Sequence, residues 1–205
     1  MKKLILDKAM AIIKEKYTDY DEKKLATIRY GLEGVYLTIT KAIVIFIIAY
    51  FLNIIKELVI LLILFNFIRL VSFGLHAKNS IACLISSIII FIICPFMCKY
   101  IIINKHIKIF LFIPIVTLIT LFSPADTEKR PIVNKKRRLI YRLLSMIISI
   151  IYMIISIYTK NNLVSNSLII ALLIQLFLIN PISYKLFGVS YNNYKRYKSK
   201  VLVNC

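Results

Sequence analysis

The run "IACLISSIIIFIICPFMCKYIII", residues 81–103, decides the class of fold to which this chain belongs. Lys99 is its one charged residue, and about 20 mainly apolar residues suffice for a helix to cross a bilayer. Comparable apolar runs cover residues 35–55, 58–72, 107–123, 139–159 and 163–182. The sequence therefore predicts an all-α, polytopic helical membrane protein with about six transmembrane helices. The run at 58–72 is short and contains Arg69, so we expect it to be tilted, broken or ended early in a polar pocket.

The composition supports this class. The 205 residues are 60% hydrophobic, whereas soluble domains average about 45–50% apolar residues. The net charge of +19 is accompanied by no nucleic-acid-binding motif, so we expect no nucleic-acid partner. Four cysteines, at positions 83, 94, 98 and 205, show no disulfide or zinc spacing. Cys94 and Cys98 lie one helical turn apart in an apolar run and are expected to be packed there.

The distribution of basic residues predicts the orientation. With six spans and both termini on the cytoplasmic side, 23 basic residues fall inside and five outside. Cytoplasmic loops of membrane proteins are enriched in Lys and Arg. A five-span arrangement would place the head or the tail outside and has a weaker bias. We therefore expect a multi-pass protein of the cell membrane with both termini in the cytoplasm.

The first 33 residues are rich in both charge signs, with eight basic and six acidic residues. Apolar residues recur there at roughly helical spacing: Leu6, Ala9, Ile13, Tyr17 and Tyr20. This pattern is typical of one or two N-terminal amphipathic helices on the membrane surface; a soluble cap packed on the loops is the alternative. We expect an amphipathic segment at 1–34, a transmembrane domain at 35–184 and a basic cytoplasmic tail at 185–205.

A polar stretch, "RLVSFGLHAKNSIAC", residues 69–83, overlaps the start of the apolar run at 81–103. Ionisable groups near hydrocarbon are costly, so the cluster indicates a functional site. His76 and Cys83 could form a nucleophilic pair, in which imidazole accepts the thiol proton. Seven residues of continuous helix would separate them by about 10.5 Å, so the loop at Gly74 should let His76 fold back toward Cys83, in the first turns of the next helix. A structural thiol and an interfacial histidine are the alternative.

A metal site made of His76, His106 and a carboxylate is disfavoured. The expected topology places His106 across the bilayer from His76. We therefore expect no metal and no cofactor.

A second cluster, "SPADTEKRPI", residues 123–132, falls on the same, cytoplasmic side of the expected topology. Pro124 and Pro131 bracket a non-helical turn. The basic residues that follow, up to position 138, are typical of a loop that fixes topology and meets anionic lipid of the bilayer. Asp126 is harder to explain in that way, because an acid in a basic loop near the membrane should pair with something.

"GLHAKNSIAC" and "SPADTEKRPI" together resemble the AgrB family, the accessory gene regulator B proteins of Gram-positive quorum sensing. The resemblance implies a membrane cysteine endopeptidase with Cys83 as nucleophile and His76 as general base. The family's other characteristic positions, supporting or substrate-binding, fall on Arg69, Gly74, Ser123, Asp126, Lys129 and Arg130. One departure is visible, since Phe73 stands where the family often has the first glycine of a pair.

The resemblance also implies a partner and a reaction. The enzyme would remove the C-terminal tail of an AgrD-type precursor peptide and, through an acyl-enzyme thioester, promote cyclisation to a thiolactone or lactone autoinducing peptide. A homodimer is implied as well. The alternatives are a small exporter of a signalling peptide without protease activity and a non-catalytic scaffold. Transporters commonly show internal repeats, and this chain has none that we find.

Overall fold

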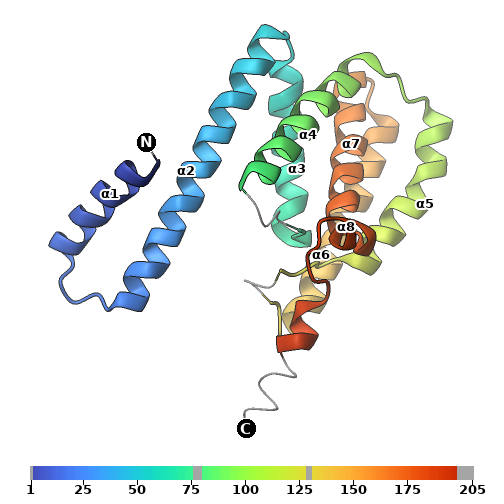
Figure 1. Cartoon of the computed structure of the whole chain (residues 1–205). Helices are drawn as coiled ribbons and strands as arrows, with labels where there is room; N and C mark the ends of the chain where they lie inside the picture. Colours follow the sequence, from blue (N-terminus) through green and yellow to red (C-terminus); the bar gives the residue numbers. More distant parts are fainter. Residues whose placement is uncertain (1, 76–79, 128–130, 198–205) are drawn as a thin grey trace. The chain divides into compact units, whose positions relative to one another are not determined.

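A computed structural model describes residues 2–75, 80–127 and 131–197 (Figure 1). Within these ranges all regular secondary structure is helical, and the chain forms two compact units that divide between Ile48 and Ala49. The all-α prediction is confirmed.

The first unit holds α1, Lys2–Lys16, and most of α2, Glu22–Phe51, which runs on into the second unit. α1 lies alongside the first half of α2 (Figure 1), and Arg29 Nη2 donates to Asp7 Oδ1 at 2.7 Å. Leu6 and Met10 are buried on α1. The head is thus helical, as its periodicity indicates. α2 continues without a break past residue 34, so head and first apolar run share one helix.

The second unit is built around one central helix. Its helices are α3, Ile55–Ser72; α4, Ser80–Tyr100; α5, Lys105–Phe122; α6, Lys135–Tyr158; α7, Asn162–Ile179; and the short α8, Pro181–Leu186. α7 packs against α3, α4, α5 and α6. Ile169 and Leu172 of α7 are fully buried, with Ile68, Ile119 and Met153 of its neighbours around them.

Asparagines set where four of these helices begin. Asn104, Asn134, Asn161 and Asn180 are the N-cap residues of α5, α6, α7 and α8, and each side chain accepts a hydrogen bond from a backbone N–H of the first turn. The first turn of a helix has N–H groups without partners inside the helix, and an asparagine oxygen satisfies one or two of them. The starts of these four helices are therefore well defined.

Among the residues that the structure describes, four helices are long and apolar enough to cross a membrane: α2, α5, α6 and α7. α7 is the most enclosed, with 61% of its apolar window buried against 11–28% for the others. The described part of α4 adds the shorter apolar helix Leu84–Tyr100. α3 carries Lys56, Glu57 and Arg69 and is one continuous helix, so the alternative of a broken helix is wrong. The membrane class is confirmed, and the count of six spans stays a prediction.

Candidate functional site

The two motif segments lie side by side in the second unit. The segment after α3 and the segment after α5 form a parallel bridge between Phe73 and Ala125. The N–H of Gly74 donates to Ala125 O at 3.0 Å, and the N–H of Ala125 donates to Ser72 O at 3.0 Å. The expectation that both clusters share one side of the molecule is confirmed.

Gly74 is required by its surroundings. Its φ is +130°, a conformation that side-chain-bearing residues rarely adopt, and a Cβ there would lie 3.2 Å from Leu178 O. The next residue, Leu75, donates its N–H to the same carbonyl at 3.0 Å. The chain thus passes close over the end of α7, and only glycine fits where it does so.

Phe73 adopts a conformation that also favours glycine. Its φ is +58°, and its ring packs edge-on against Tyr141 with centroids 5.0 Å apart. This is the position where the AgrB pattern often has a glycine. With ψ of −136° this backbone conformation is sparsely populated and costs about 1–3 kcal/mol for a residue with a Cβ, and the ring contact with α6 offsets part of that cost.

Two side chains hold the carbonyls of this segment. Arg69 Nη2 donates to Leu75 O at 3.2 Å, and Gln175 Nε2 of α7 donates to Phe73 O at 2.7 Å. Arg69 was expected to support the site. Gln175 was missed by the sequence reasoning, although an amide within the apolar run at 163–182 was the signal that could have found it.

The expected catalytic pair lies largely outside the described residues. His76 is outside them, as are Lys129 and Arg130. Cys83 is the fourth residue of α4, which confirms its expected place in the first turns of that helix, while its side chain lies outside the described part. The pairing of His76 with Cys83 therefore stays a prediction. Cys98, by contrast, is buried in an apolar cluster with Cys94 packed beside it, as expected for structural thiols.

Ser123 joins the end of α5 to α6. It is fully buried, and its Oγ lies 2.7 Å from Ser145 Oγ. Its carbonyl accepts a hydrogen bond from Arg142 Nε at 3.1 Å. Ser123 therefore fixes the start of the second motif segment against α6.

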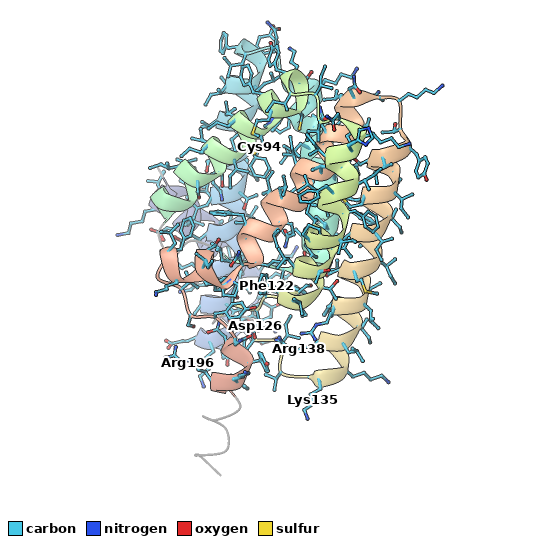
Figure 2. The ribbon with its side chains drawn as sticks, turned by 90° about the vertical axis from the view of Figure 1, so that its right-hand side faces the viewer. Cys94, Phe122, Asp126, Lys135, Arg138 and Arg196 are labelled. Carbon is cyan, nitrogen blue, oxygen red and sulfur yellow. The ribbon has the colours of Figure 1, made fainter. Side chains whose placement is uncertain are left out.

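Asp126 is buried and binds the chain's own C-terminal region. Its two carboxylate oxygens accept from the N–H groups of Asn193, at 3.1 Å, and Tyr194, at 2.8 Å. Arg138 Nη1 lies 3.6 Å from Oδ2, and Figure 2 shows Asp126 and Arg138 together near Phe122 at the end of α5. The expected partner of this acid is thus Arg138. No signal in the sequence pointed to Asn193 or Tyr194.

Tyrosines complete this cluster, which we call the Asp126 cluster: Asp126, Arg138, Tyr184, Asn193 and Tyr194. Tyr184 OH donates to Asp126 O at 3.2 Å, and the Arg138 guanidinium lies 3.6 Å from the centroid of the Tyr194 ring. Burial, and then the nearby Asp126 carboxylate, raise the pKa of Tyr184 well above its usual value. Tyr184 therefore keeps its proton and acts as a donor. Arg138 belongs to this cluster, and so it is not part of the exposed basic loop.

The opposite end of the helices carries a different polar group, which we call the Lys108 cluster: Lys108, Ser156 and Ser165. Lys108 Nζ of α5 donates to Ser165 Oγ of α7 and to Ser156 O of α6, the latter at 3.5 Å. Ser156 O lies in the last turn of α6, where carbonyls lack partners inside the helix and a cation is favoured. This cluster fastens three helices together.

Within the described residues, no three His, Cys, Asp or Glu side chains lie close enough to hold a metal ion. His106 is the second residue of α5, about 24 Å along the helix from Phe122, near which the Asp126 cluster lies. Its expected separation from His76 stays a prediction, because His76 lies outside the described residues.

Comparison with known proteins points to one family. The family model of accessory gene regulator B matches residues 6–179. An AgrB-like protein of Clostridium acetobutylicum is 29% identical over 87% of this chain and 85% of its own length, and one of Listeria welshimeri is 30% identical over 91% of both. The accessory gene regulator protein B of Staphylococcus aureus strain MW2 is 35% identical over 58% of this chain and 63% of its own. No solved structure matches the chain significantly.

Proposed function

This chain belongs to the accessory gene regulator B family, and from that premise we propose that it is an integral-membrane cysteine endopeptidase acting on an AgrD-type precursor peptide. It removes the precursor's C-terminal tail and promotes cyclisation of the remaining peptide to a thiolactone or lactone used in quorum sensing. Cys83 is the nucleophile and His76 the general base.

One observation carries the proposal: the two motif segments are hydrogen-bonded to each other through Gly74 and Ala125. Leu75 leads directly into His76, and α4, with Cys83 in its first turn, begins five residues later at Ser80. Five residues reach at most about 18 Å. This supports a site in which His76, Cys83 and the second motif share one end of the second unit.

The first chemical step is acyl transfer to Cys83. His76 accepts the thiol proton, and the Cys83 sulfur attacks the carbonyl carbon of the scissile peptide bond. The carbon–nitrogen bond breaks, the released amine takes the proton from His76, and the tail departs. The N-terminal part of the precursor stays bound as a thioester. Placement at the start of α4 favours the thiolate, since a helix N-terminus stabilises negative charge.

The second step closes the ring. A cysteine thiol or serine hydroxyl of the bound peptide attacks the thioester carbonyl, the bond to Cys83 breaks, and Cys83 regains its proton. Water would compete by hydrolysing the thioester. A site enclosed by protein at the membrane interface excludes water and so favours ring closure.

The precursor tail meets a basic surface in this proposal. AgrD-type precursors carry acidic tails, and Lys135, Lys136 and Arg137 are exposed at the start of α6, at the same end as the Asp126 cluster. Such a surface attracts an acidic peptide over a distance of about 10 Å at 0.1 M salt. Arg69, Gly74, Ser123 and Asp126 support the site by holding backbone segments, while Lys129 and Arg130 are proposed to contact the precursor.

The active site faces the cytoplasm in this proposal, because 23 of the basic residues then lie inside and five outside. Single cysteines placed in intact cells report the orientation. A membrane-impermeant maleimide should label position 105 and leave position 135 unlabelled. Labelling at position 135 from outside would contradict the orientation.

Mutation of the nucleophile tests the activity itself. Purified chain in vesicles is incubated with precursor, and tail release, ring closure and covalent adducts are followed by mass spectrometry. The parent should show a hydroxylamine-sensitive adduct on Cys83. Cys83→Ala should lose the adduct and both products, and His76→Ala should stall before the adduct while still binding precursor. Cys94→Ala is the matched control and should process normally.

Two outcomes would overturn the proposal. Full processing by Cys83→Ala would show that another group cleaves the precursor. Transport of peptide across the vesicle membrane by Cys83→Ala, without any cleavage by the parent, would instead support an exporter.

A further inference from the structure

Gln175 is a buried amide in the most enclosed helix of the molecule. It is fully buried, and its neighbours along α7 are Ile174 and Leu176. Its Nε2 donates to Phe73 O at 2.7 Å, and its Oε1 has no hydrogen-bond partner among the described residues. Burial of a polar group is unfavourable unless its bonds compensate. The hydrogen bond to Phe73 O is therefore the interaction that leucine or methionine at this position could not make.

The carbonyl that accepts from Gln175 belongs to Phe73, the residue at which α3 ends and the segment leading to His76 begins. Phe73 closes α3, since its N–H donates to Arg69 O at 3.0 Å. Its φ of +58° then turns the chain out of the helix. Gly74 and Leu75 follow, bonded to Ala125 and Leu178, and the next residue is His76. Gln175 thus fixes the first peptide group of the segment that leads into the proposed general base.

We propose that Gln175 is a positioning residue of the peptidase site, acting through the Phe73 carbonyl to set the path of the chain into His76. The inference rests on the proposed function. Gln175 itself touches neither substrate nor the reacting sulfur in this proposal. Its effect is on how well His76 and Cys83 are aligned.

The chain supplies a matched control on the same helix. Asn166, nine residues earlier on α7, is also buried, and its Nδ2 donates to the backbone carbonyls of Cys98, at 3.3 Å, and Ile101, near the end of α4. Asn166 therefore resembles Gln175 in being a buried amide of α7 that donates to backbone carbonyls, but it lies at the opposite end of the helix. Loss of either amide costs a buried hydrogen bond, but only Gln175 adjoins the segment before His76.

The test compares Gln175→Met with Asn166→Leu in a chain that keeps Cys83 as its one cysteine. Cys94, Cys98 and Cys205 are replaced by alanine, and the reporter is the rate of Cys83 alkylation by iodoacetamide as pH is varied. Thiolates react and thiols do not, so the profile gives the apparent thiol pKa, which is about 8.5 without a base partner. Processing rates at saturating precursor and melting temperatures are measured on the same samples.

In Gln175→Met we expect the alkylation profile to move toward the ordinary thiol pKa and kcat for processing to fall at least tenfold, with KM little changed. Asn166→Leu should keep the parental profile and kcat at a comparable loss of melting temperature. Equal behaviour of the two variants in profile and kcat would show that Gln175 is structural only and overturn the inference. Cys83→Ala, assayed in parallel, separates this result from failure of the proposed function, because it is inactive only if Cys83 is the nucleophile.

Discussion

The two ends of the second unit bury polar side chains in different ways. The Lys108 cluster joins helices to helices, since Lys108 of α5 binds Ser156 of α6 and Ser165 of α7. At the Asp126 end, Asp126 accepts from the N–H groups of residues 193 and 194, which begin a short helical stretch, and Gln175 donates to the carbonyl of Phe73, where α3 ends. The Lys108 cluster links helices of the bundle, and the Asp126 end holds the segments that follow α3 and α5 together with the start of the helical stretch at 193–197.

The difference follows from what a membrane permits. Non-helical backbone near hydrocarbon must have its N–H and C=O groups satisfied by protein. Gly74, Leu75 and Ala125 are all buried, and their N–H groups donate to the carbonyls of Ala125, Leu178 and Ser72. The segments after α3 and α5 thus have these backbone N–H groups satisfied by protein, as the proposed peptidase site would require.

The largest effect is expected from Asp126→Asn. The amide nitrogen of asparagine would face a backbone N–H of residue 193 or 194, and Arg138 would lose its charged partner. Removing one member of a buried ion pair costs about 3–5 kcal/mol. We expect stability to fall by about that amount and precursor processing to be lost, measured by thermal unfolding in detergent and by the vesicle assay.

Asp7→Asn is the control for this prediction. Asp7 also pairs with an arginine, at 2.7 Å, but both side chains are about half exposed. Exposed pairs contribute about 0–1 kcal/mol. If the two substitutions lower the stability equally, the buried Asp126 cluster stabilises the fold no more than an exposed ion pair does.

The sequence predicted the helices well and the cluster poorly, for physical reasons. Each apolar run lies within one helix, so the ends of α4 and α5 fell within about three residues of expectation. The hydrogen bonds that link Asp126 with Asn193 and Tyr194 span 67 and 68 residues, and no local sequence pattern predicts them. Arg138 was placed in the basic loop because sequence shows its charge and not its burial. Arg69 and Gly74 were singled out within the polar stretch 69–83, and the resemblance to a family then implied their supporting role.

A smaller effect is expected from Gly74→Ala, which tests whether the close passage over α7 matters. The new Cβ would lie 3.2 Å from Leu178 O on a backbone with φ of +130°. The close contact and the positive φ both disfavour alanine. We expect the free energy of unfolding to fall by about 1–3 kcal/mol and processing to slow at least tenfold. Gly188→Ala separates the effect of a positive φ from the effect of the contact, because Gly188 has φ of +59° and nothing within 4 Å of its Cβ position. Equal losses in the two variants would mean that the contact with Leu178 is unimportant.

The smallest effect is expected from Lys108→Met, in the cluster that links α5, α6 and α7. Methionine keeps the unbranched stem and removes the ammonium group. Ser165 Oγ still donates to Ser156 O at 2.6 Å, and Ser156 Oγ to Ser165 O at 3.0 Å, so neither serine is left without a partner. The lost cap on α6 and the relieved burial of a charge oppose each other, so stability should change by about 1 kcal/mol or less. Processing should match the parent, as it should in the exposed control Lys105→Met. A Lys108→Met chain that melts normally yet fails to process precursor would show that the Lys108 cluster serves the reaction as well, and the division between the two ends would have to be abandoned.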